Sequence, residues 1–174
     1  MVTGMNETGI NKKKICLLGA FAVGKTSLVQ QYVHSIFSDK YHTTVGVKIE
    51  KTRVDVDGDA VDLIIWDLHG EDEFQHVRLS YLKGSSGLIF VADGTRQATL
   101  ATALNLKQIA ENTIGEVPVT LLVNKSDLED QWEIAPGLIE ELKSQGIPVI
   151  RTSAKTGRSV RQAFETLTRN MLGK

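Results

Sequence analysis

The sequence predicts an α/β fold built on a six-stranded mixed sheet, mostly parallel, with helices on both faces. Short apolar runs alternate along the chain with segments of helical spacing. Most of these runs are continuously apolar, which is typical of parallel strands that are covered on both faces. The run Asp57-Gly58-Asp59 is a hairpin signal between two further strand patterns, so it predicts one antiparallel strand at an edge.

The expected order is strand, helix, two hairpin strands, a short helix and then three strand–helix units. Six segments have the composition expected of strands: 14–18, 45–56, 61–67, 88–92, 119–123 and 149–152. Four segments have helical spacing: 25–35, 100–113, 136–145 and 160–172. The third of these helices opens at Pro136, a residue suited to a first helical turn. In such sheets a ligand binds beyond the carboxyl ends of the strands.

Length and charge bound the possible functions. The 174 residues suit one domain, which we expect over 12–174 after a small, polar and flexible tail over 1–11. The formal net charge of −1 gives no support for nucleic-acid binding. The only local excess of charge, Lys12-Lys13-Lys14, is expected to be a solvated lead-in to the first strand.

Cysteine usage and hydropathy indicate a cytoplasmic protein. The single cysteine, Cys16, lies in an apolar run and is expected to be buried. No apolar run approaches the ~18 residues of a membrane span. The segment 171–174 carries no cysteine that could be lipidated, so we expect no lipid anchor.

A phosphate-binding loop is the strongest chemical signal. Gly19-x-x-x-x-Gly24-Lys25-Thr26 follows a predicted strand and opens a predicted helix, which is the context this motif requires. Backbone N–H groups of the loop and the helix N-terminus point at phosphate oxygens. Lys25 adds a positive charge on the β- and γ-phosphates, and Thr26 offers a hydroxyl to Mg²⁺. The expected phosphate-binding residues are Ala22, Val23, Gly24, Lys25, Thr26 and Ser27.

A second signal, Asn124-Lys125-Ser126-Asp127, predicts guanine recognition at the end of a buried strand. A carboxylate at Asp127 accepts two hydrogen bonds, and guanine offers N1–H and its 2-amino group side by side. Adenine presents an acceptor at N1 and would leave that carboxylate badly paired, which opposes an ATPase. Lys125 is expected to pack along the base, and Asn124 to tie this loop to the phosphate loop. In the run 152–155, we expect Ser153 and Lys155 beside the base, and the backbone N–H of Ala154 on guanine O6.

The metal and the γ-phosphate have their own candidates. Asp67, at the end of the third strand, is expected to hold Mg²⁺ through a water, because magnesium keeps several of its waters. Gly70 is placed for a backbone N–H to reach the γ-phosphate. Thr44 is the candidate for a second hydroxyl on the metal, and its neighbour Thr43 stays open.

Taken in this order, these pieces resemble the Ras superfamily of small GTPases over residues 13–172. Within it, 37–47 resembles the first switch of the Rab branch, and 66–67 with 80–84 resembles the second. The resemblance implies the small G domain of P-loop NTPases, which binds GTP or GDP with Mg²⁺. It implies that Phe37 packs edge-on against guanine and that Tyr41 closes over the phosphates.

The resemblance also implies partners. Ile49, Trp66 and Tyr81 are the positions of the apolar patch that effectors and regulators read, with ordinary core filling as the alternative. We expect a monomer, with dimerisation left open. The missing C-terminal prenylation cysteines and the run Asp93-Gly94-Thr95-Arg96 depart from eukaryotic Rab proteins, which suggests a prokaryotic Rab-like GTPase. A chain truncated at its tail would lack the same cysteines, so that alternative stays open.

Two departures bear on catalysis, for which Lys25, Gly70 and Glu71 are the candidates. Glu71 stands where the family has its catalytic glutamine, and an ionised carboxylate cannot donate a hydrogen bond to the transferring phosphoryl group. We therefore expect slow hydrolysis; a general-base role and a side chain turned to solvent are both open. A binding module that holds GTP or GDP as a scaffold, without effective hydrolysis, is the alternative function.

Phe21 is the second departure, in the middle of the phosphate loop. The loop acts through backbone N–H groups, which phenylalanine also has, so nucleotide and Mg²⁺ binding should be intact. The ring is expected to obstruct an arginine supplied by a partner protein. A ring that rests on the switch segments as structural cover is the alternative.

Overall fold

The computed structural model describes residues 11–40, 44–71 and 76–174, and it confirms the predicted fold class. The six strands form one sheet in the order β2-β3-β1-β4-β5-β6. β2 runs antiparallel to β3, and the remaining neighbours pair in parallel. The strands are β1 (Asn11–Gly19), β2 (Val47–Val56), β3 (Asp59–Leu68), β4 (Gly87–Asp93), β5 (Val119–Asn124) and β6 (Val149–Arg151).

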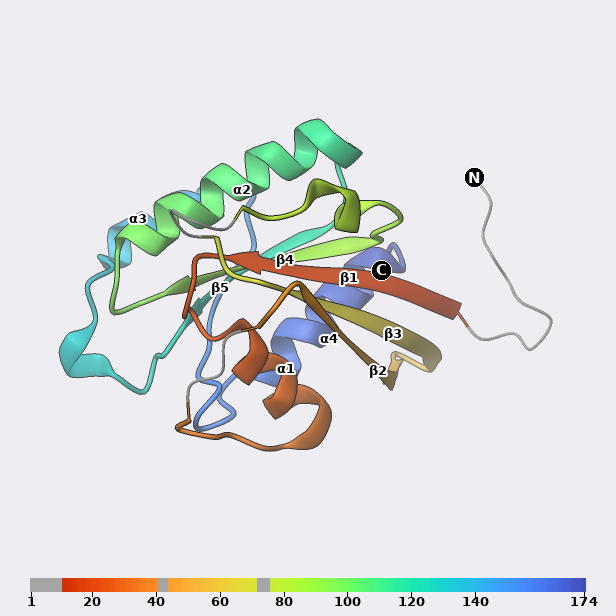
Figure 1. Cartoon of the computed structure of the whole chain (residues 1–174), viewed down its shortest axis with the longest axis horizontal. Helices are drawn as coiled ribbons and strands as arrows, with labels where there is room; N and C mark the ends of the chain where they lie inside the picture. The colour runs from red at the N-terminus through yellow and green to blue at the C-terminus, as the bar shows by residue number, and fades with distance from the viewer. Residues whose placement is uncertain (1–10, 41–43, 72–75) are drawn as a thin grey trace.

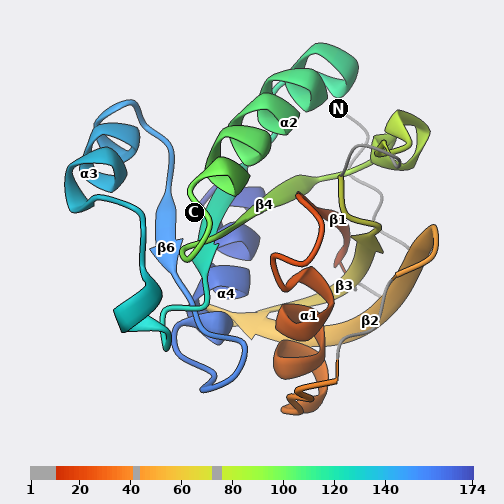
Figure 2. The same ribbon diagram turned by 60° about the vertical axis from the view of Figure 1, so that its left-hand side comes forward.

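Helices cover both faces of this sheet (Figures 1 and 2). They are α1 (Lys25–His34), α2 (Ala98–Ile114), α3 (Pro136–Ser144) and α4 (Val160–Met171), with short 3₁₀ turns η1 (Leu79–Leu82) and η2 (Glu129–Gln131). Alternate residues of β1 feed the two cores, because successive strand side chains point to opposite faces. Ile15 and Leu17 pack in the cluster with α1 and α4, whereas Cys16 and Leu18 pack in the cluster with α2 and α3. Cys16 is buried, as predicted.

Backbone conformation explains where several elements begin and end. Gly46 has a φ of 74°, so β2 begins at Val47 and not at the predicted residue 45. Ser35 takes the left-handed conformation and ends α1 one residue earlier than predicted. Asp57 and Gly58 both have positive φ, which is what a two-residue turn between antiparallel strands requires.

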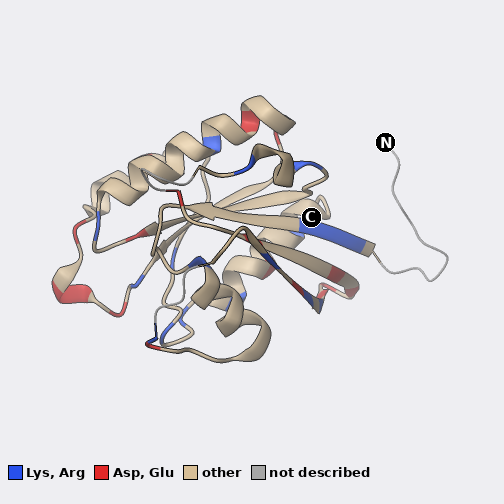
Figure 3. Ribbon diagram, in the orientation of Figure 1, with Lys and Arg blue, Asp and Glu red and all other residues tan. Residues whose placement is uncertain are grey.

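The prediction that the three early lysines precede the first strand was wrong, whereas solvent exposure holds for Lys12. These residues lie inside β1, where Lys12, Lys13 and Lys14 are in register with residues 62–64 of β3. Figure 3 shows the basic residues of β1 in blue, near the start of the strand. The Lys14 ammonium lies 3.7 Å from the centroid of the Trp66 ring and donates to the Tyr81 carbonyl at 2.6 Å. These contacts give Lys14 partners for both its stem and its charge. The strand begins earlier than the apolar run alone indicates because residues 11–13 pair with residues 61–63 of β3.

Candidate functional site

A cavity of about 800 Å³ lies at the edge of the sheet where β1, β3, β5 and β6 end. This volume is in the range of small-molecule sites. Thirteen residues predicted from the sequence line it: Ala22, Gly24, Lys25, Thr26, Ser27, Phe37, Thr44, Gly70, Asn124, Lys125, Asp127, Ala154 and Lys155.

The other predicted residues lie behind this lining or outside the described chain. Val23 is buried, and its carbonyl accepts a hydrogen bond from Asn124 Nδ2 at 3.0 Å. Ser153 is buried as well, and its hydroxyl donates to Asp127 Oδ1 at 2.7 Å. Tyr41 and Thr43 fall outside the described residues.

The phosphate loop joins β1 to α1 through an unusual backbone path. Ala22 has a φ of 61°, and Gly24 has a φ of 100°. A Cβ at position 24 would overlap the Asn124 side-chain amide, so only glycine fits between the loop and the end of β5. The loop leads directly into the N-terminus of α1, where free N–H groups favour an anion.

Lys25 is the buried cation of this loop. Its Nζ donates to the Ala20 carbonyl at 3.0 Å and to the Gly19 carbonyl at 3.3 Å. Burial lowers the pKa of Lys25 to about 8, and the charge of Asp67 opposes that shift. A negative charge placed beside the ammonium would therefore stabilise its charged form.

The three residues predicted to hold a metal, Thr26, Thr44 and Asp67, lie together at the N-terminus of α1. Thr26 Oγ1 donates to Asp67 Oδ2 at 2.6 Å and lies 2.8 Å from Thr44 Oγ1. Asp67 Oδ1 is buried and has no hydrogen-bond partner among the described residues. Burial raises the pKa of Asp67, and the Thr26 hydrogen bond opposes the shift. Hydroxyl and carboxylate oxygens with one unpaired buried atom fit a hard cation such as Mg²⁺.

A metal at this point would depend on hydroxyls and phosphate as well as on protein carboxylates. Within residues 11–40, 44–71 and 76–174, no group of three or more His, Cys, Asp and Glu side chains is arranged to hold a metal ion. The donor set fits a cation that arrives with a phosphate ligand and keeps several waters.

The loop after β5 joins the phosphate loop to the loop after β6. Asn124 is buried, and its Oδ1 accepts from Thr152 Oγ1 and from the Ala154 N–H, both at 3.2 Å. Lys125 Nζ donates to the Ala22 carbonyl at 3.0 Å. The predicted tie from Asn124 to the phosphate loop is thus present, and Lys125 adds a second tie. Asp127 is exposed in the cavity, with one oxygen oriented by Ser153.

Gly70 and Glu71 are attached to the phosphate loop through their backbone. The Glu71 N–H donates to the Gly19 carbonyl at 2.9 Å, and the Phe21 N–H donates to the Glu71 carbonyl at 3.0 Å. A Cβ at Gly70 would overlap the Phe21 backbone. The Glu71 carboxylate accepts from His76 Nδ1 at 2.6 Å and from the Val77 N–H at 2.7 Å, and it does not line the cavity. Phe21 does line it.

The residues of the predicted effector patch form a half-buried group on the surface. Ile49 is 51% exposed and is paired with Trp66 across the β2–β3 ladder. The rings of Trp66 and Tyr81 are 5.9 Å apart between centroids. The three side chains therefore form one continuous apolar strip, and simple core filling does not describe Ile49.

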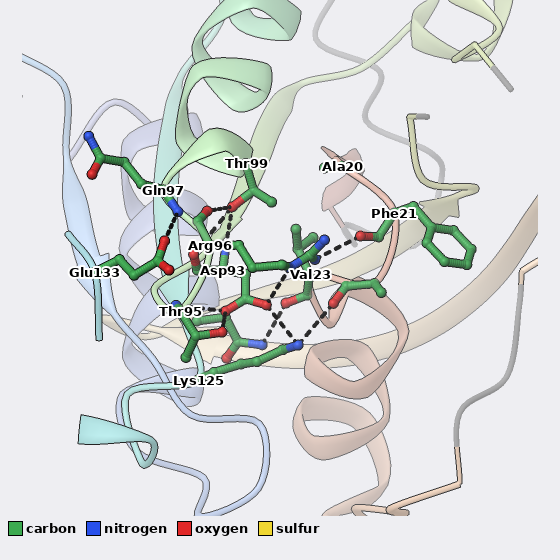
Figure 4. Close-up of polar contacts among 12 residues, drawn as sticks. Ala20, Phe21, Val23, Asp93, Thr95, Arg96, Gln97, Thr99, Lys125 and Glu133 are labelled. Atoms are coloured by element: carbon green, nitrogen blue, oxygen red, sulfur yellow. Dashed lines mark hydrogen bonds and ion pairs between the residues drawn. The ribbon is translucent and has the colours of Figure 1, made fainter. Parts of the chain in front are cut away.

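Asp93 and Arg96 also lie at this edge of the sheet, and no role was predicted for them. Asp93 is buried and accepts from Lys125 Nζ at 2.8 Å and from Arg96 Nε at 3.0 Å (Figure 4). Burial works to raise the pKa of Asp93, but hydrogen bonds from Lys125, Thr95 and Arg96 outweigh it and hold the pKa below its usual value. Their position at the end of the apolar strand β4 and directly after it was the signal that could have found them.

The fold and the site together define the class of protein. A Gly-x-x-x-x-Gly-Lys-Thr loop between β1 and α1 of a mostly parallel sheet is the arrangement of P-loop nucleotide-binding domains. The sequence profile described as Ras family matches residues 14–173. The chain belongs to the Ras family, and it is a GTP-binding small GTPase of the Rab-like kind.

Individual relatives support this assignment. The Ras-related protein Rab-13 of Bos taurus is 32% identical over 161 residues, which are 91% of this chain and 79% of the relative. The Ras-related protein Rab-8B of Homo sapiens is 30% identical over 163 residues, 92% of this chain and 79% of the relative. The Ras-related protein SEC4 of Saccharomyces cerevisiae is 34% identical over 158 residues, 88% and 72% respectively. A prokaryotic origin of this chain stays a prediction.

Along the described parts of the chain, no helix has the length and apolar character needed to cross a bilayer. A cytoplasmic location, a monomeric state and the absence of a lipid anchor stay predictions.

Proposed function

We propose that this chain is a molecular switch that binds GTP or GDP with Mg²⁺ in the cavity described above and hydrolyses GTP slowly. The observation that carries the proposal is the meeting, in one cavity, of the phosphate loop, the Thr26–Thr44–Asp67 oxygens and Asp127. The loop offers a phosphate site, the oxygens a metal site, and the carboxylate a guanine site.

Each part has a defined task in this proposal. Backbone N–H groups of residues 22–27 receive the phosphates, and the Lys25 ammonium leaves its carbonyl partners for the β- and γ-oxygens. Thr26, Thr44 and Asp67 would hold the metal through their oxygens. When bound, Mg²⁺ supplies charge neutralisation at the phosphate oxygens. Asp127 accepts two hydrogen bonds from guanine, with Lys125, Ser153, Ala154 and Lys155 around the base and Phe37 against its edge.

The γ-phosphate would also determine the order of the switch segments. Thr44 and Gly70 are the contacts through which it would organise 41–47 and 70–81. Gly70 lies against the Phe21 backbone, and both residues line the cavity in which the γ-phosphate would lie. Ile49, Trp66 and Tyr81 lie on and beside these segments, which suits them to report the bound nucleotide to an effector or regulator.

The alternative function, a binding module without effective hydrolysis, is favoured by one observation. The Glu71 carboxylate accepts hydrogen bonds from His76 and from the Val77 N–H, and Glu71 is not among the residues that line the cavity. A side chain held in this way orients no water at a γ-phosphate. The intact Lys25, Thr26, Thr44 and Asp67 set favours the enzyme.

The Asp127→Asn variant tests which base the cavity accepts. An amide cannot accept both hydrogen bonds that guanine donates, so GDP affinity should fall at least 100-fold, on the order of the discrimination that a hydrogen-bonding site achieves. The amide does offer a donor where xanthine has an acceptor. Affinity for xanthosine diphosphate should rise in parallel. Isothermal titration of both nucleotides measures this, with Asp130→Asn on the nearby η2 turn as the matched control. Undiminished GDP affinity in Asp127→Asn would show that the base is assigned wrongly.

A further inference from the structure

The run Asp93-Gly94-Thr95-Arg96 has no task in the proposed chemistry, yet it reaches the phosphate loop. It follows β4, whose neighbours in the sheet are β1 and β5. The Arg96 guanidinium donates from Nη2 to the Phe21 carbonyl at 2.8 Å (Figure 4). The Phe21 ring points away from this contact in Figure 4. Arg96 therefore binds the backbone of the loop and not the Phe21 side chain.

Three consecutive carbonyls of the phosphate loop accept hydrogen bonds from three different side chains. Arg96 Nη2 donates to Phe21, Lys125 Nζ to Ala22 at 3.0 Å, and Asn124 Nδ2 to Val23 at 3.0 Å. A phosphate loop presents its N–H groups to the ligand. These donors therefore hold the loop through its carbonyls and leave the N–H groups of residues 22–27 for phosphate, while the Phe21 N–H donates to Glu71.

Two of these donors are themselves fixed by one buried carboxylate. Asp93 has a side chain 1% exposed, and Lys125 and Arg96 each form an ion pair with it. The Thr95 N–H and hydroxyl also donate to Asp93, at 2.9 and 2.7 Å. A carboxylate with this many donors is rigid, so the cations that it holds are placed before any ligand arrives.

The loop needs such support at this position. Ala22, the residue after Phe21, has a φ of 61°, which costs free energy for a residue with a Cβ and persists only where the surroundings impose it. Arg96 donates to the Phe21 carbonyl and Lys125 donates to the Ala22 carbonyl. The two contacts therefore lie on either side of the strained φ of Ala22.

We propose that Arg96 is a positioning residue that holds the phosphate loop in its binding conformation through the Phe21 carbonyl and thereby slows nucleotide release. This inference rests on the proposed function of the cavity. Arg96 uses two nitrogens at once, Nε on Asp93 and Nη2 on Phe21. Lysine has a single terminal nitrogen on a flexible stem and cannot reproduce this fork.

Release of a fluorescent GDP analogue, chased by excess GDP in the presence of Mg²⁺, tests the inference. Arg96→Ala should release the analogue about tenfold faster, the scale of one lost charge-assisted hydrogen bond at a half-exposed site. Arg96→Lys should stay fast although it keeps the charge. Arg161→Ala, which removes an exposed arginine of α4, should match the wild type. Circular dichroism of each nucleotide-free variant checks the fold.

Two results would overturn the inference. One is wild-type release by Arg96→Ala; the other is full restoration of slow release by Arg96→Lys, since charge alone would then suffice. If Arg96→Ala does not fold, Arg96→Lys decides by itself, because the inference requires it to release faster than the wild type. A wild-type chain that binds no GDP analogue would defeat the proposed function as well, whereas normal wild-type binding with unchanged variants defeats this inference alone.

Discussion

At the scale of single residues, Lys25 shows how burial prepares a side chain for its ligand. The residue is 5% exposed, and its ammonium has two backbone carbonyls as hydrogen-bond partners. Removal from water disfavours the charged form and lowers the pKa to about 8. A bound diphosphate would favour the charged form again, so nucleotide binding and protonation of Lys25 are linked.

We therefore expect GDP to bind with proton uptake near pH 8. About half of the Lys25 side chains are neutral at a pH equal to the pKa, and each must take up a proton when phosphate binds, giving about 0.5 proton per GDP. Uptake should shrink toward pH 7, where the free protein is already charged. Calorimetric titration in two buffers of different ionisation enthalpy measures the protons exchanged.

The control for this linkage is Lys25→Arg, studied at concentrations that saturate it. Arginine stays charged throughout this pH range, so its uptake at pH 8 should be near zero. Equal uptake by the two proteins would assign the proton to the nucleotide or to another group.

At the scale of elements, the loop from 128 to 135 packs against the run that carries Arg96. The Glu133 N–H donates to the Gly94 carbonyl at 2.8 Å, and Glu133 Oε2 accepts from the Gln97 N–H at 2.8 Å, beside the start of α2. The Trp132 ring lies so close to Gly94 that an added Cβ would overlap it. The Arg151 guanidinium lies over the Trp132 ring, with its central carbon 4.2 Å from the ring centroid.

Gly94→Ala should therefore destabilise the protein by about 1–3 kcal/mol, because the indole must move to admit a methyl group. Gly137→Ala is a matched control in α3, where nothing lies within 4 Å of the added carbon. That change should be neutral or stabilising by up to about 1 kcal/mol. Urea unfolding of both variants measures the difference in unfolding free energy. Equal stabilities would contradict the tight packing of Trp132 on Gly94.

Patterns along the sequence predicted elements better than contacts between them. Continuous apolar runs located β4 and β5, and the Asp57-Gly58 turn located the hairpin, because these features are local. The β1 boundary was missed because Lys12 and Lys13 look solvated until their partner strand is known. Arg96 was noticed as a departure, but its distance from Phe21 depends on the tertiary fold.

At the scale of the whole molecule, parallel strands bring distant motifs to one edge. Segments 19–27, 67–71, 93–96, 124–127 and 152–155 all follow strands and meet around one cavity or directly behind it. The candidate binding residues could be predicted because they belong to short local motifs whose residue types are typical of phosphate, metal and guanine binding. Which of them bond to one another was not, since that depends on strand order and on the backbone path of the phosphate loop.

Two arrangements at this edge bear on the rate of hydrolysis. Glu71 occupies the position of the family's glutamine, and its carboxylate is held by His76 and Val77. The backbone of Gly70–Glu71 is attached to the phosphate loop at Gly19 and Phe21. A glutamine could donate to the transferring phosphoryl group, whereas the ionised carboxylate cannot, so Glu71→Gln should hydrolyse faster than the wild type.

The most direct test of the switch is a single turnover of GTP. Excess protein is mixed with Mg²⁺·GTP, and GDP formation is followed by chromatography over hours, with Glu71→Gln and Arg161→Ala alongside. We expect slow, steady conversion by the wild type and by Arg161→Ala, and conversion about 10–100-fold faster by Glu71→Gln. GTP that stays intact with the wild type throughout would contradict this expectation and would identify the chain as a nucleotide-binding module without hydrolysis of its own.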